Sequence, residues 1–220
     1  MANTLKLFIS YCSEDSEAFP LLLKDYFECS NGFDVFLASK SLDMGDDFKQ
    51  EILSNLAVSD LFIPLFSRNF LNSIYANQEV GIAIEKRLKI MPVSIDGTNP
   101  RGFIDHLHAH HASNLDETEA IRIVSRVFSN LIRNPKYSQF HEKTIDSLSA
   151  SFLKCNHFKK TSLALEFMKI ALQNGFRFNP IHLSVIKKGI EENSQVKNAE
   201  YLMPNIKQFL RDAYDLVIDI

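Results

Sequence analysis

Residues 59–84, SDLFIPLFSRNFLNSIYANQEVGIAI, contain the pattern that decides the fold. The first half holds an unbroken apolar run from Leu61 to Phe66, which predicts a strand covered on both faces, as in a parallel sheet. Pro64 weakens this prediction, because proline cannot donate a hydrogen bond to a neighbouring strand. After Ser67 the apolar residues recur at spacings of three and four, which indicates a helix. The stretch therefore predicts a strand that leads directly into one helix.

Glu79 interrupts the apolar face of that helix, in its predicted third turn, one turn after Tyr75 and one turn before Ala83. A lone glutamate at such a position usually marks the edge of an apolar stripe or reaches out to solvent. The alternative is a functional carboxylate, because open parallel sheets bind ligands at the carboxyl ends of their strands. The helical spacing alone leaves both interpretations open.

The first part of the chain alternates strands with helices. Further strands are predicted at residues 5–11, 33–37 and 89–95, with a weak one at residues 110–114, and further helices at residues 16–28, 47–57 and 117–132. A polar loop, residues 38–47, separates the second strand from its helix, and a loop of this length is usually functional. Five alternations predict an α/β fold with a doubly wound, five-stranded parallel sheet.

The pattern changes after Asn134-Pro135, and only helices are predicted beyond this point. Their ranges are residues 141–155, 161–173, 180–194 and 200–220. We therefore expect an α/β domain over residues 1–135 and a small all-α region over residues 136–220.

Composition excludes several classes of function. The net charge is −3 and there is no basic run, so nucleic acid and anionic membranes are poor candidate partners. No apolar run has the length of a transmembrane helix, and the amino terminus has too short an apolar core for a signal peptide. Three widely spaced cysteines exclude a disulfide framework. We expect a cytoplasmic protein.

Several familiar chemistries also lack their motifs. None of the seven glycines forms a dinucleotide fingerprint or a Walker loop. A receiver domain needs a phosphoacceptor aspartate where this chain has Ser67. Residues 105–111 place histidines at alternate positions, which admits a metal site, although a solvated loop is the commoner explanation and we assign no metal ligand. Cys12 has no evident base partner for thiol catalysis.

Four separated segments carry a family resemblance: FISYCSED at residues 8–15, SLDMGDDF at 41–48, LFSRNFLNSIYANQEV at 65–80 and IMPVSID at 90–96. In this order and spacing they resemble a Toll/interleukin receptor (TIR) domain over about residues 5–134, and in particular the NAD-cleaving TIR effectors of bacterial, Thoeris-like antiphage defence. The resemblance implies a flavodoxin-like fold. It also makes residues 38–47 the counterpart of the family's BB loop.

Catalytic members of that family cleave the nicotinamide–ribose bond of NAD+, using a glutamate four residues after an aromatic residue, usually Trp. The resemblance implies that Glu79 is the catalytic residue here and that Tyr75 replaces the Trp. The other residues that it implies at the NAD+ site are Tyr11, Cys12, Ser13, Gly45, Phe48 and Ser67. It further implies self-association through the BB loop, and activation by a defence-system partner or a phage-derived trigger.

A single carboxylate suits this reaction for a chemical reason. Ordinary glycosidases use two, one of which protonates the leaving group. Nicotinamide in NAD+ already carries a positive charge and departs neutral, so one carboxylate that stabilises the ribosyl cation suffices. NAD+ is then a substrate, no prosthetic group is expected, and the product is ADP-ribose or a cyclic form. Two alternatives remain: a non-catalytic TIR scaffold, and a nucleoside ribosyl- or deoxyribosyltransferase with Glu79 as nucleophile.

Overall fold

The computed structural model describes residues 3–38 and 48–216, and these form two compact units. One unit contains Leu5–Asp25 and Asp34–Val127. The other contains Tyr26–Phe33 and Phe128–Ile220, together with Met1–Thr4. We refer to them as the sheet unit and the helical unit.

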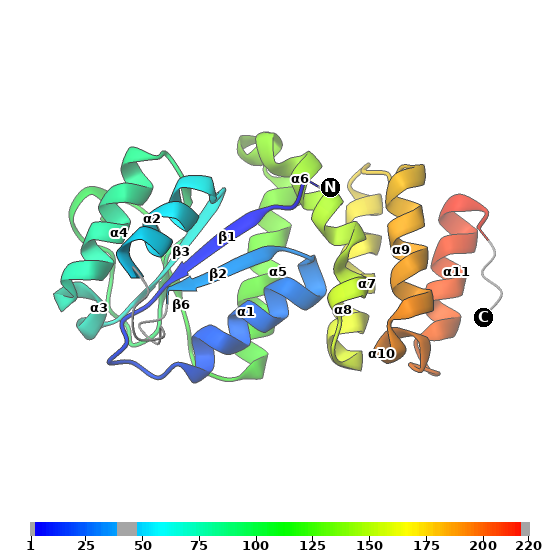
Figure 1. The fold of residues 1–220 in the computed structure, drawn as a ribbon, viewed down its shortest axis with the longest axis horizontal. Helices are drawn as coiled ribbons and strands as arrows, with labels where there is room; N and C mark the ends of the chain where they lie inside the picture. Colours follow the sequence, from blue (N-terminus) through cyan, green and yellow to red (C-terminus); the bar gives the residue numbers. More distant parts are fainter. Residues whose placement is uncertain (1–2, 39–47, 217–220) are drawn as a thin grey trace. The chain divides into compact units, whose positions relative to one another are not determined.

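The sheet unit is built on a wholly parallel sheet (Figure 1). Its strands are β1 (Lys6–Ser10), β2 (Asp34–Ala38), β3 (Leu61–Phe66), β4 (Lys89–Ile90), β5 (Val93–Ser94) and β6 (His110–His111). Their order is β2-β1-β3-β5-β6, and β4 also pairs with β3. With β4 and β5 counted as one interrupted strand, this is the 2-1-3-4-5 order of flavodoxin-like folds. The predicted doubly wound sheet is confirmed.

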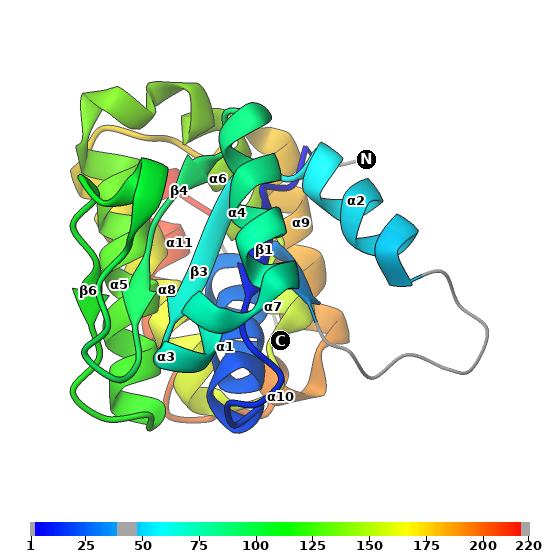
Figure 2. The ribbon, with the colours of Figure 1, turned by 90° about the vertical axis from the view of Figure 1, so that its left-hand side faces the viewer.

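Helices cover both faces of this sheet, with α2, α3 and α4 on one face and α1 and α5 on the other (Figure 2). Their bounds are α1 (Ala18–Asn31), α2 (Phe48–Val58), α3 (Arg68–Asn72), α4 (Ile74–Glu85) and α5 (Glu117–Arg133), with a short 3-10 helix, η1 (Gly102–Ile104). The last turns of α1 and α5 belong to the helical unit. Because β3 is covered on both faces, all six of its residues are buried.

Two prolines explain why the single strand predicted at residues 89–95 is wrong in detail. Leu61 pairs with Lys89 and Leu65 pairs with Val93, so the register does not shift between β4 and β5. This register places Pro64 opposite Pro92 in the interval between the two short strands. Since neither proline has an N–H group, the ladder is interrupted there and resumes beyond.

A second correction concerns the helix predicted after Ser67, which is two helices. Ser73 ends α3 and begins α4, with an extended backbone at φ −75° and ψ 118°. Its side chain accepts a hydrogen bond from the Ala76 N–H, as an N-cap serine does. Glu79 therefore lies in the second turn of α4 and not in the third turn of a longer helix.

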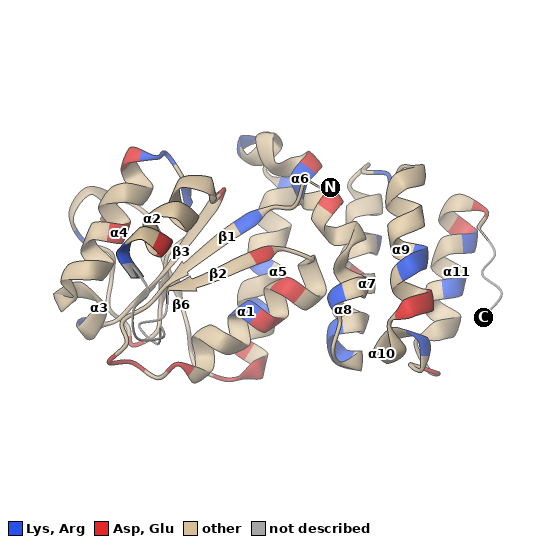
Figure 3. Ribbon diagram, viewed as in Figure 1, with Lys and Arg blue, Asp and Glu red and all other residues tan. Residues whose placement is uncertain are grey.

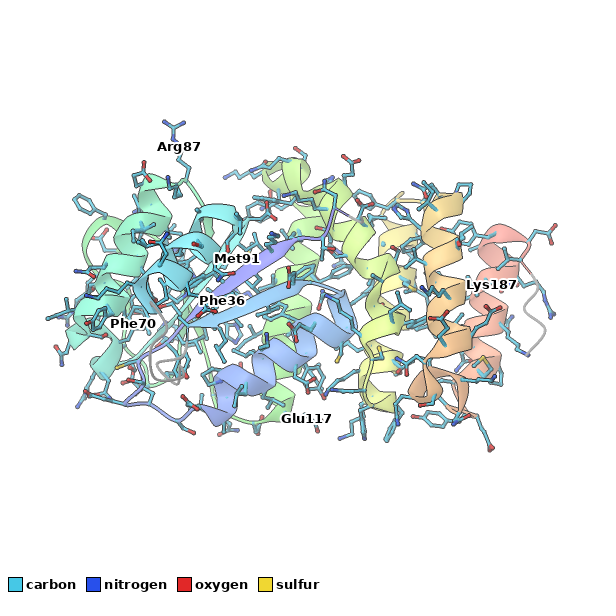
Figure 4. All side chains as sticks on the ribbon, in the orientation of Figure 1. Phe36, Phe70, Arg87, Met91, Glu117 and Lys187 are labelled. Atoms are coloured by element: carbon cyan, nitrogen blue, oxygen red, sulfur yellow. The ribbon has the colours of Figure 1, made fainter. Side chains whose placement is uncertain are left out.

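Helix α4 ends in a Schellman motif, in which the Leu88 N–H donates to the Ala83 carbonyl oxygen over 2.9 Å. Arg87 holds the left-handed position of this motif, with φ 56°, where glycine is the usual residue. Its side chain projects away from the fold (Figure 4). The chain can then turn directly into β4.

The helical unit contains the end of α1, the end of α5 and all the later helices. These are η2 (Pro135–Phe140), α6 (His141–Ser149), α7 (Ser151–Lys154), α8 (Phe158–Gln173), α9 (Pro180–Glu192), α10 (Ser194–Lys197) and α11 (Met203–Tyr214). The sequence predicts the positions of the main helices, but the helix expected at residues 141–155 is broken at Ala150 and the last one begins at Met203.

The turn after α1 shows how tightly the helical unit packs. Gly32 has φ 71°, and a Cβ atom there would lie 1.8 Å from the Ser147 carbonyl oxygen, so only glycine fits. The Lys154 Nζ atom donates to the carbonyl oxygens of Gly32 and Phe33 over 3.1 and 2.7 Å. The turn at Gly32 is therefore an anchor point of this unit.

Candidate functional site

Glu79 is buried against the sheet, at the point where β1 ends. Only 5% of the residue is exposed, and its Oε2 atom accepts a hydrogen bond from the Ser10 hydroxyl over 2.5 Å. Ser10 is the last residue of β1 and is fully buried. The other buried residues of α4 are Ala76 and Ala83, whose small side chains let the helix approach the sheet on either side of the carboxylate. The carboxyl end of a central strand thus meets an acidic side chain.

Burial changes the acidity of this carboxyl group. Loss of solvent raises the pKa of Glu79 from its ordinary 4.5 to about 7, and the hydrogen bond from Ser10 partly offsets that rise. Burial dominates because a charge in a poorly solvated site loses more than one hydroxyl returns. Near neutral pH the side chain is therefore present in both protonated and ionised forms.

A pocket of about 140 Å³ lies beside Glu79, between α2 and α4. Its lining is mostly apolar and consists of Lys49, Ile52 and Leu53 from α2 with Tyr75, Gln78, Glu79 and Ile82 from α4. Tyr75 is 41% exposed, so its ring is accessible from this pocket. The aromatic residue and the carboxylate that the sequence places one turn apart therefore share one site. Pockets for whole ligands usually measure about 300–1,000 Å³, so the described residues enclose room for one ring-sized group.

The three predicted site residues that follow β1 do not line this pocket. The Tyr11 hydroxyl donates to Glu17 Oε1 over 2.7 Å, and Cys12 is buried in an apolar cluster with Phe70 and Ala76. Ser13 is exposed. The loop that contains them is rich in acidic residues, which colour the ribbon red between β1 and α1 in Figure 3. Of the three, only Ser13 is accessible to a ligand.

Ser67 organises the loop after β1 rather than the pocket. Its hydroxyl donates to Asp15 Oδ2 over 2.6 Å and accepts from the Phe70 N–H over 2.9 Å, so it also caps α3. Asn69 donates to the other oxygen of Asp15, Oδ1, over 2.8 Å. These bonds join the carboxyl end of β3 to the loop that follows β1.

Three polar residues of this region were not singled out from the sequence: Ser10, Asp15 and Asn69. All three lie inside the segments that carry the family resemblance. Their partners are 52 to 69 residues away along the chain, however, so no local spacing reveals the pairing. Two predicted residues cannot be placed: Gly45 and the side chain of Phe48 lie outside the described part of the chain.

One residue of the histidine-rich segment, His110, lies in a hydrogen-bond network with two side chains of α5. The Nδ1 atom of His110 lies 3.0 Å from an Arg126 nitrogen that can only donate, so Nε2 carries the proton and donates to Glu119 Oε1 over 2.5 Å. Arg122 pairs with the second Glu119 oxygen. Within residues 3–38 and 48–216, no group of three or more His, Cys, Asp or Glu side chains could hold a metal ion.

The sheet order and the carboxylate at the end of β1 define a flavodoxin-like domain with a candidate site at the edge where such folds bind ligands. A sequence model of one family, described as "TIR domain", matches residues 7–124, which is more than half of the chain. The protein therefore belongs to the TIR domain family.

Comparison with solved structures finds TIR domains at low sequence identity. The TIR domain of the Toll-related receptor TRR-2 from Hydra magnipapillata is 20% identical, with 58% of this chain and 98% of that chain covered and a TM-score of 0.46. The TIR domains of the activated Roq1 resistosome, which recognises the pathogen effector XopQ, are 16% identical, with 76% and 99% covered and a TM-score of 0.37. No curated protein matches the sequence. Among the helices of the described residues, none has both the length and the apolar character needed to cross a membrane.

Proposed function

We propose that this TIR domain is an NAD+ glycohydrolase or cyclase that cleaves the bond between nicotinamide and ribose. The observation that supports the proposal most directly is the buried carboxylate of Glu79, which lines a mostly apolar pocket that Tyr75 also lines. A buried acidic group has a cost in stability that a purely structural position does not require. Groups with strongly shifted pKa values that line a pocket are candidates for catalysis.

The chemistry follows from these two side chains. The Tyr75 ring offers a face for the flat nicotinamide, at one turn from the carboxylate. The bond between ribose C1′ and the pyridinium nitrogen breaks, its electron pair stays on nicotinamide, and the ribose becomes cationic. Ionised Glu79 stabilises this cation. Water then adds with loss of a proton to give ADP-ribose, or a group of the same molecule adds to give a cyclic product.

The size of the pocket bears on assembly. A ring-sized space of about 140 Å³ holds nicotinamide but not the rest of NAD+, so further surfaces must complete the site. We propose that self-association through the BB loop, residues 38–47, supplies them. If Gly45→Pro changes neither the oligomer size nor NAD+ cleavage, this part of the proposal is wrong.

The test of activity is nicotinamide release from NAD+ by the purified protein, alone and with lysate from phage-infected cells. Release in either condition supports the enzyme, and its absence in both contradicts it. Liquid chromatography with mass spectrometry of the same samples distinguishes linear from cyclic ADP-ribose.

The second candidate function is a non-catalytic TIR scaffold, and the small pocket is the observation that favours it. A scaffold requires partner binding but no turnover, so Glu79→Gln would leave its function unchanged. A nucleoside ribosyl- or deoxyribosyltransferase is the remaining alternative. A covalent ribosyl adduct trapped on Glu79 with a nucleoside, but not with NAD+, would favour it.

The biological role that we propose is antiphage defence in the bacterial cytoplasm, with NAD+ as substrate and no prosthetic group. In this role the helical unit senses a trigger or promotes assembly. Loss of phage protection on Glu79→Gln, in cells that produce the protein at unchanged levels, is the expected result.

A further inference from the structure

The hydroxyl of Ser10 is the one polar group that the described residues place against the Glu79 carboxylate. It approaches from β1, whereas Glu79 comes from α4, and 69 residues separate them in the chain. Both residues are buried, so water does not compete for the hydrogen bond. The 2.5 Å distance between the two oxygens is in the range of hydrogen bonds from a hydroxyl to a charged carboxylate.

We propose that Ser10 is a positioning residue for the reaction, whose hydroxyl holds the Glu79 side chain in one orientation and favours its ionised form. The inference rests on the proposed function, in which only the ionised carboxylate stabilises the ribosyl cation. An ionised carboxylate only accepts hydrogen bonds, so the Ser10 hydroxyl must be the donor of the hydrogen bond to Oε2. This leaves Oε1 as the oxygen available to the ribose.

Other groups near the carboxylate do not perform this task. Lys49 from α2 shares the pocket, but its side chain is exposed and water screens its charge. Tyr75 lies on the same helix as Glu79 and is also partly solvated. Without Ser10, burial acts on the carboxylate without the opposing hydrogen bond, and the protonated form becomes dominant at neutral pH.

Ser10→Ala tests the inference, because it removes one buried oxygen and leaves the strand unchanged. From the usual net contribution of a hydrogen bond to a charged group, we expect loss of this bond to raise the midpoint of the pH–rate profile by about one to two pH units. Nicotinamide release at pH 7 should then fall about five- to fifty-fold and recover at pH 9. Ser10→Thr keeps the hydroxyl and should keep a midpoint close to that of the wild type.

Ser94 provides a matched control. It is likewise fully buried and ends a strand, β5, but its hydroxyl has no hydrogen-bond partner among the described residues. Ser94→Ala makes the same chemical change, so it should leave both the rate and the midpoint unchanged.

A direct titration separates failure of this inference from failure of the proposed function. Carbon-13 NMR of labelled glutamate side chains, with Glu79→Gln used for assignment, measures the Glu79 pKa whether or not the protein is active. A higher midpoint in Ser10→Ala than in the wild type and Ser94→Ala supports the positioning role. An equal midpoint overturns it, even if NAD+ cleavage is observed. If the wild type releases no nicotinamide, the proposed function fails and the positioning role fails with it, and the titration then reports only on the hydrogen bond.

Discussion

Tyr75 and Glu79 lie one helical turn apart on α4 and line the same pocket, although Tyr75 is 41% exposed and Glu79 only 5%. The Tyr75 ring is thus accessible to a ligand from solvent, whereas the Glu79 carboxylate is shielded from solvent. In the proposed reaction Tyr75 stacks on the nicotinamide ring from the side open to solvent, and Glu79 faces the ribose carbon to which the ring is bonded.

Glu79→Gln is expected to abolish NAD+ cleavage while NAD+ binding and self-association remain. Glutamine keeps the size and helix propensity of glutamate but has no charge to stabilise the ribosyl cation. Removal of one preorganised charge-stabilising group costs on the order of 10² to 10³ in rate, and more where no second carboxylate assists. Nicotinamide release, together with NAD+ binding by calorimetry, measures both properties. A variant that turns over at the wild-type rate would exclude Glu79 as the catalytic residue.

The same substitution, Glu79→Gln, is expected to increase stability, and the size of the increase depends on pH. Burial raises the pKa of Glu79 from 4.5 to about 7, so the unfolded state loses its proton first as the pH rises. Below pH 4.5 Glu79 is protonated in both the folded and the unfolded state, so its ionisation does not change the free energy of unfolding. Between pH 4.5 and 7 the folded state loses stability, to a total on the order of 3 kcal/mol. Activity should rise over the upper part of this range, because it requires the ionised form.

Denaturant unfolding at pH 5 and pH 8 checks this prediction. Glutamine cannot ionise, so the free energy of unfolding of Glu79→Gln relative to the wild type should be higher at pH 8 than at pH 5. If the difference in the free energy of unfolding between Glu79→Gln and the wild type is the same at both pH values, Glu79 is not desolvated in solution.

Tyr75 is expected to act through its ring rather than its hydroxyl. Tyr75→Phe and Tyr75→Trp should keep NAD+ cleavage within a few-fold of the wild type, whereas Tyr75→Ala should lower kcat/KM by about two- to tenfold, the range expected for one aromatic stacking contact. Steady-state kinetics of the three variants measures the effect. Loss of activity in Tyr75→Phe would instead assign a role to the hydroxyl.

The sequence predicts most of the sheet because β1 and β3 are apolar on both faces, a local property of each segment. It does not predict the break at Ser73, since the three-and-four spacing of apolar residues continues across the capping serine from Leu71 to Ile74 and Tyr75. The interruption of the strand at residues 89–95 has a local signal, Pro92, but its position opposite Pro64 is visible only in the register of the sheet.

In the candidate site, too, some features follow from local sequence patterns and others depend on contacts between distant segments. Helical spacing places Glu79 one turn after Tyr75 on the same helix, and the family resemblance gives the two residues their predicted roles. The Ser10 hydrogen bond depends on how α4 packs against the end of β1, and the Asp15 contacts depend on how β1 and β3 lie side by side. No local pattern in the sequence encodes either arrangement. The predicted roles of Tyr11 and Cys12 came from position within a motif, and position does not reveal that the first is bonded to Glu17 and the second packs in the core.

Two helical glycines should respond to alanine in opposite directions. Gly189 lies in α9, where a Cβ atom would come within 2.7 Å of the Phe152 Cβ and 3.0 Å of the Leu153 nitrogen. Alanine gains about 1 kcal/mol of helix propensity there, but overpacking costs about 1–3 kcal/mol and the obstructing atoms belong to or adjoin the backbone. We expect Gly189→Ala to destabilise the helical unit.

Gly81 is the control, because it is exposed on α4 and has nothing within 4 Å of a Cβ atom. Gly81→Ala should stabilise the sheet unit by about 0.5–1 kcal/mol. Denaturant unfolding followed by circular dichroism measures both variants. Equal or greater stability of Gly189→Ala would mean that α7 and α9 lie farther apart in solution than this close contact requires.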